Sequence, residues 1–83
     1  MEVNNPDHPD MLLFRVSTEN LNAVTVRLRV LGGLGRYPEA YQMLVLERSR
    51  RELQSPPQGI RLARATFEAL PGDVQQLLLA EAS

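Results

Sequence analysis

The chain of 83 residues contains no cysteine and a single histidine, and these two scarcities exclude whole classes of site. Without cysteine the chain forms neither a disulfide nor a thiolate-ligated zinc site, and one imidazole cannot build a His-rich metal centre. Lysine is absent too, so all nine basic residues are arginine, which reflects a GC-rich coding sequence more readily than a function. We therefore expect no metal and no other cofactor.

Long apolar runs and a strong charge imbalance are also missing. No stretch approaches the ~20 apolar residues that a transmembrane helix needs. The acidic, proline-containing opening MEVNNPDHPD is unlike a signal peptide. A net charge of −1 supplies no global attraction to nucleic acid or to a membrane surface. These features predict a cytoplasmic protein that does not bind membranes, with residues 1–10 as a flexible tail.

What the chain does contain is enough apolar residues for one small domain, which we place at residues 11–83. The hydrophobic fraction is 43%, which suits a globular core. A chain this short buries a modest share of its surface and is marginal alone. Since disulfides and metals are excluded, a partner subunit is the natural source of further burial. We expect binding to another protein, together with self-association.

The stretch LGGLGRYPEA, residues 31–40, decides the expected fold class. Gly32 and Gly33 suit the end of one helix, and Pro38 with Glu39 suits the first turn of the next. The stretch is therefore interpreted as a corner between two antiparallel helices. We predict an all-α bundle with helices near 18–31, 38–54, 58–70 and 72–82, preceded by a short strand or extended segment at 11–16.

Three of these segments carry further expectations. Residues 24–30, VTVRLRV, also alternate cleanly between apolar and polar positions, which leaves a strand open as an alternative to the helix. The charged run ERSRRE, residues 47–52, is expected to project into water from its helix. In the 58–70 segment, an apolar stripe at helical spacing is formed by Ile60, Ala63, Phe67 and Leu70.

The corner carries a family resemblance. Gly35, Tyr37, Glu39 and Ala40 occupy the positions that those residue types take in the inter-helix corner of a tetratricopeptide repeat. The chain resembles one such repeat over residues 21–54. It departs in the first helix, where Arg27 replaces a large apolar residue. About three repeats normally make a stable solenoid, so the resemblance implies a single repeat-like helical hairpin.

The first function hypothesis is a small non-catalytic protein-interaction module, such as an adaptor, a chaperone or an anti-activator-like regulator. Grooves between helices accept an amphipathic or extended peptide from a partner. The candidate contacts are apolar residues left over after a core is built. A plainer interpretation makes them core or homodimer interface, because buried apolar residues usually only pack. The candidates are Tyr41, Met43, Leu46 and Leu62.

The second hypothesis is a dimeric DNA-binding regulator. If residues 24–30 are a strand, the chain resembles ribbon-helix-helix repressors, in which two strands pair across a dimer. Thr25, Arg27 and Arg29 would then share one face and read the major groove. Further phosphate contacts would come from a local basic patch of Arg48, Arg50, Arg51, Arg61 and Arg64.

An enzyme is the least favoured class. The chain has no cysteine nucleophile, no glycine-rich phosphate loop of a known pattern and no histidine outside the N-terminal segment. We therefore predict no catalytic residues.

Overall fold

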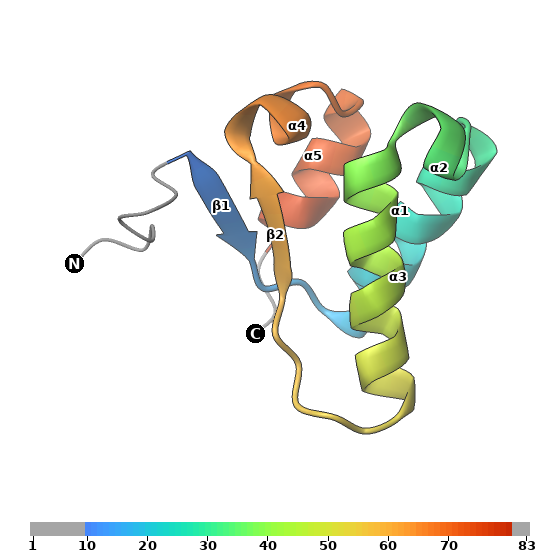
Figure 1. Ribbon diagram of the computed structural model, residues 1–83, viewed down its shortest axis with the longest axis vertical. Helices are drawn as coiled ribbons and strands as arrows, with labels where there is room; N and C mark the ends of the chain where they lie inside the picture. The colour runs from blue at the N-terminus through green and yellow to red at the C-terminus, as the bar shows by residue number, and fades with distance from the viewer. Residues whose placement is uncertain (1–9, 81–83) are drawn as a thin grey trace.

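The computed structural model describes residues 10–80, and within them two short strands are combined with five helices (Figure 1). In chain order the elements are β1 (Met11–Phe14), α1 (Thr18–Val30), α2 (Gly33–Arg36), α3 (Pro38–Glu52), β2 (Ile60–Ala63), α4 (Arg64–Glu68) and α5 (Gly72–Leu79). The predicted tail, residues 1–10, lies outside the described residues except for Asp10.

The two strands make the fold mixed rather than all-α. β1 pairs antiparallel with β2, with Met11 opposite Ala63 and Phe14 opposite Ile60. The all-α prediction is therefore wrong. The predicted extended segment at 11–16 is confirmed by β1, but the predicted helix at 58–70 is replaced by β2 followed by α4. Alternation along a strand sends Ile60 and Leu62 into the core and leaves Arg61 on the outer face.

Residues 24–30 belong to α1, so the strand alternative is also wrong at that place. A fold with strands and helices is closer to the ribbon-helix-helix-like alternative than to an all-α bundle, but its strands lie elsewhere. Helix α1 begins where the Ser17 side chain accepts a hydrogen bond from the Asn20 N–H. It buries Leu21, Val24 and Leu28 completely, because helical spacing brings these three onto one face.

The corner after α1 contains a turn that only glycine fits well. Gly32 has φ +132°, and a Cβ atom there would lie 2.7 Å from Cβ of Arg36. The chain then makes one helical turn, α2, before Pro38 opens α3 at its first position. The predicted helices at 18–31 and 38–54 are confirmed, with α2 between them.

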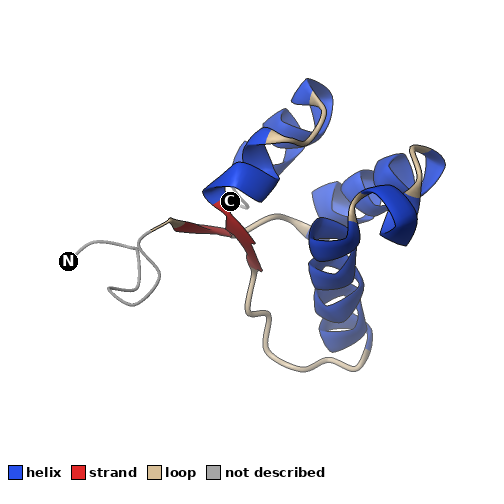
Figure 2. Ribbon diagram, turned by 45° about the horizontal axis from the view of Figure 1, so that its top comes forward, coloured by secondary structure: helices blue, strands red, loops and turns tan. Residues whose placement is uncertain are grey.

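The core lies where the sheet meets both groups of helices. In Figure 2 the two strands lie beside the α4–α5 pair, and α5 packs directly against α1 of the unit made by α1, α2 and α3. The rings of Phe14 and Phe67 stack with centroids 4.9 Å apart, which fixes α4 against β1. Val74 and Leu78 of α5 close the core and are almost fully buried.

Candidate functional site

A groove follows the seam where α3 meets β2 and α4, and we call it the front groove. Its first half, the methionine end, has a volume of about 220 Å³. Met11 of β1 and Met43 of α3 line it, with Leu62 at its floor. Unbranched methionine side chains adapt their shape to different apolar guests.

The second half of the front groove, the alanine end, has a volume of about 310 Å³ and lies beside the start of α3. Small residues line it, among them Ala40, Ala65 and Ala69, so the backbone of α3 and α4 is close to the surface here. The two halves share Glu39 and Thr66, whose side chains are joined by a 2.7 Å hydrogen bond. The front groove is thus two apolar hollows separated by one polar bridge.

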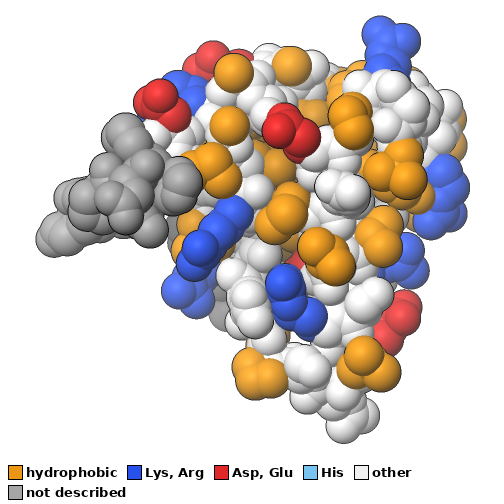
Figure 3. Space-filling view, in the orientation of Figure 1, with side chains coloured by type: hydrophobic (Ala, Val, Ile, Leu, Met, Phe, Trp, Pro, Cys, Tyr) orange, Lys and Arg blue, Asp and Glu red, His pale blue; other side chains and the backbone are white. Residues whose placement is uncertain are grey.

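Arginines stand at both ends of the front groove. Arg61 lines the methionine end and Arg36 lines the alanine end, where its guanidinium lies 5.9 Å from the centroid of the Tyr37 ring. Neither forms an ion pair with another side chain within residues 10–80. Figure 3 shows this side of the molecule, with basic groups set among gathered hydrophobic side chains. The surface is therefore apolar with cationic ends.

The residues predicted for partner binding fall in different places. Met43 lines the methionine end, and Leu46 lies one turn further along α3 with half of its side chain exposed. Leu62 is only 2% exposed and is mainly a core residue. The Tyr41 hydroxyl accepts a hydrogen bond from Arg29, away from the lining of the groove.

The residues predicted for DNA binding do not form one basic face. Thr25 is fully buried and its hydroxyl donates to the Leu21 carbonyl, so it cannot reach a ligand. Arg27 pairs with Asp73 at 2.9 Å and Arg48 with Glu52 at 3.8 Å. Arg50 and Arg51 both bind Glu47.

Glu47 is the polar centre of the molecule, and its burial corrects the expectation that ERSRRE projects into water. Its carboxylate accepts from Arg50 at 2.9 Å and from Arg51 at 3.0 Å, and it is fully buried. The backbone N–H of Gln58 lies 3.2 Å from both carboxylate oxygens. We call this cluster the Glu47 brace, because it ties the end of α3 to the loop that leads into β2.

The charge of Glu47 is stabilised in place. Burial alone works to raise the pKa of Glu47, but hydrogen bonds from Arg50, from the Gly59 and Gln58 backbone and from Arg51 outweigh it and lower that pKa below its ordinary value. Arg51 also donates to the Thr18 hydroxyl at 3.1 Å, which links the brace to the start of α1. The signal in the sequence was the spacing of Glu47 three and four residues before two arginines.

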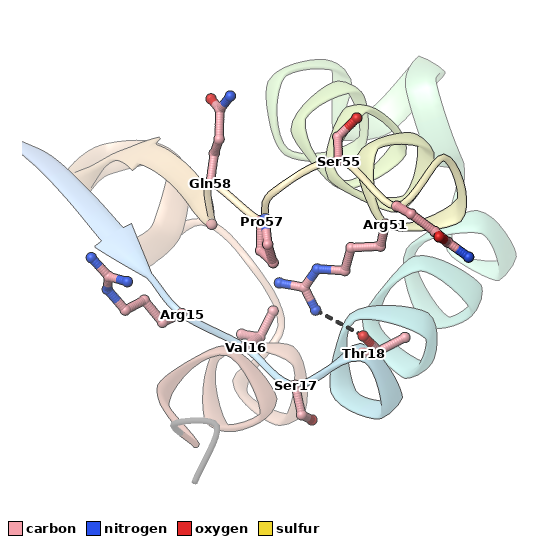
Figure 4. A pocket seen from close by; sticks show the side chains of 10 residues that line it. Arg15, Val16, Ser17, Thr18, Arg51, Ser55, Pro57 and Gln58 are labelled. Carbon is pink, nitrogen blue, oxygen red and sulfur yellow. Dashed lines mark hydrogen bonds between the residues drawn. The ribbon is translucent and has the colours of Figure 1, made fainter.

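A hollow of about 640 Å³, larger than either half of the front groove, lies over this brace and is lined by both Arg15 and Arg51. Figure 4 shows the Arg51 guanidinium directed to Thr18, while the side chains of Arg15 and Gln58 point away from the hollow. The Arg51 guanidinium, which lines the hollow, is therefore already hydrogen-bonded to Glu47 and Thr18. We interpret this hollow as a consequence of the path of the loop between α3 and β2.

Comparisons with protein families, curated proteins and solved structures gave no match for this chain. Between residues 10 and 80, no helix combines the length and the apolar character that crossing a membrane requires.

Proposed function

We propose that the protein is a small non-catalytic protein-interaction module and that the front groove is its docking surface. The observation that carries the proposal is the pair of adjacent apolar hollows with an arginine at each far end. Met11 and Met43 are only partly buried, and Ala65 and Ala69 are exposed, so the domain leaves apolar surface uncovered beside charged residues. Exposed apolar surface with a polar rim is typical of interaction sites.

The partner segment that fits this groove is an acidic amphipathic helix. Helices dock in grooves through apolar side chains spaced three, four or seven residues apart. One anchor would enter the methionine end and another the alanine end, one on each side of the bridge between Glu39 and Thr66. Acidic residues flanking the anchors would meet Arg36 and Arg61, which gives the pairing its direction.

The test compares two matched leucines. Leu46 beside the groove and Leu79 on α5 are 50% and 52% exposed, so an aspartate at either position costs the fold little. Tagged wild-type protein and the variants Leu46→Asp and Leu79→Asp are used to purify bound proteins, which are quantified by mass spectrometry. We expect the same protein with wild type and Leu79→Asp, and at least about tenfold less of it with Leu46→Asp.

A further variant tests the role of the arginines at the ends of the front groove. Arg61→Glu should reduce capture of the same protein, and added salt should reduce capture by the wild type, because rim charges act through screened attraction. Equal capture by wild type, Leu46→Asp and Arg61→Glu contradicts the proposal. A captured protein whose binding segment is basic contradicts the assigned partner chemistry.

A further inference from the structure

Helix α1 is apolar on two sides, although only one side faces the core. Leu21, Val24 and Leu28 are fully buried on the inner side. On the opposite side stand Val26 and Val30, whose side chains are 52% and 72% exposed. A surface helix normally presents polar residues there. The outer side therefore carries apolar surface that the domain itself leaves uncovered.

These outer residues follow the spacing of a coiled-coil seam. Together with the exposed Ala23 they form what we call the outer stripe, Ala23, Val26 and Val30, with steps of three and four residues. Such steps place successive side chains along one line that a second helix can contact. Ala23 is small, so two helix backbones could approach closely beside it. The outer stripe shares no residue with the front groove.

We infer that the outer stripe is a homodimer interface in which α1 packs antiparallel against α1 of a second copy. The charges on α1 favour a second copy of the same helix, packed in the antiparallel direction. The first turn of α1 carries Glu19, and its last turn carries Arg29, which forms no ion pair within residues 10–80, beside Arg27, which pairs with Asp73. In an antiparallel pair centred between Ala23 and Val26, Glu19 of each chain falls beside the arginine-bearing end of the other. A parallel pair would set like charges together.

The two-fold symmetry of a homodimer doubles this charge complementarity. A two-fold interface uses the same residues on both chains, so each favourable contact occurs twice. The opposed helix dipoles also favour the antiparallel arrangement. A domain of this size gains useful stability from covering a second apolar face, since its own core is small. The interface leaves the front groove of each copy available for the partner proposed above.

The experiment measures oligomeric state by sedimentation equilibrium of the full chain over a dilution series. We expect a reversible wild-type dimer. Val30→Asp should weaken it by about 100-fold or more, because two buried valines are lost per dimer. The matched control is Leu53→Asp, at a position 78% exposed after the end of α3, and it should leave the dimer intact. Circular dichroism checks that each variant remains folded.

Charge reversal tests the antiparallel direction. Glu19→Arg should weaken the dimer by about tenfold, and adding Arg29→Glu to the same chain should restore it, because the two exchanged charges face each other again. A wild type that stays monomeric at every concentration overturns the inference. So does equal weakening by Val30→Asp and Leu53→Asp, or a dimer that is indifferent to Glu19→Arg.

Discussion

On α3, the inner side, which faces the core, carries a buried charge, whereas the side that faces the front groove carries an exposed apolar residue. On the inner side Glu47 is buried with a full charge, and two arginines and the backbone of the following loop satisfy its oxygens. On the side facing the front groove Leu46 is half exposed, whereas Met43, one turn before Glu47, is partly buried against the core. The buried charge serves the fold, whereas the exposed Leu46 adds little to the core.

This contrast separates residues that hold the molecule together from residues that are free to meet a partner. Arginines that bind acids of the same chain, namely Arg27, Arg48, Arg50 and Arg51, are poor indicators of function. Apolar residues at the surface are better indicators. Substitutions on the two sides should therefore have separable effects on stability and on binding.

The largest effect on stability is expected on the inner side. Glu47→Ala removes the centre of the Glu47 brace and leaves the Gln58 N–H without its acceptor, which should lower the free energy of unfolding by about 3 kcal/mol. Urea denaturation followed by circular dichroism measures this loss. Glu39→Ala on the same helix is the matched control and should cost less than about 1 kcal/mol, because Glu39 is exposed. Equal losses of unfolding free energy in Glu47→Ala and Glu39→Ala would contradict the contrast between the two sides of α3.

The loop between α3 and β2, which the Glu47 brace holds, should also be sensitive to substitution. Gly59 has φ +85°, and a Cβ atom there would lie 3.0 Å from the Phe14 carbonyl oxygen. Gly59→Ala should therefore destabilise the fold by about 2 kcal/mol. Gly35 has no atom within 4 Å of the corresponding position, so Gly35→Ala in α2 should be neutral or slightly stabilising. The melting temperatures of the two variants give the comparison, and a harmless Gly59→Ala would contradict it.

A smaller effect should follow the charge of Glu47. Its pKa is lowered in the folded state, so its ionised form contributes stability above the ordinary carboxyl value of 4.5, and this contribution is lost as the pH falls through the lowered value. Glu47→Gln should be less stable than wild type at neutral pH by about 1 kcal/mol, and the difference should shrink in acid. Denaturation curves over a pH series measure it. A difference that is constant with pH would show that the charge is irrelevant.

The smallest effect on stability is expected beside the front groove. Leu46→Asp should change the free energy of unfolding by less than about 0.5 kcal/mol, because the side chain is half exposed. Thermal unfolding of this variant next to Leu79→Asp checks this. A loss comparable with that of Glu47→Ala would mean that Leu46 serves the fold, and the contrast between the two sides of α3 would fail.

Local signals in the sequence predicted α1 and α3, but not the structure of residues 58–70. Gly32 and Pro38 act within one or two turns of themselves, so the end of α1 and the start of α3 could be predicted from the chain. In residues 24–30 the alternating pattern competed with the helical stripe. The helix prevailed because Leu21, Val24 and Leu28 together cover the core.

Long-range pairing set the limit of prediction. The β2 segment carries a helical stripe through Ile60 and Ala63, and only its pairing with β1, far away in the chain, makes it a strand. The same is true of the candidate site. Met11 and Met43 meet at the groove through that sheet, and no local pattern places them together. The burial of Glu47 likewise depends on the returning loop at Gln58.

The most direct test of the proposed docking surface is photo-crosslinking inside the cell. A photoreactive amino acid replaces Gln42, an exposed residue that lines the methionine end, and in a second strain it replaces Leu79 on α5. The account predicts that the probe at position 42 crosslinks a discrete protein through an acidic amphipathic segment and that the probe at 79 does not. The same crosslinked protein from both positions, or none from position 42, would contradict it.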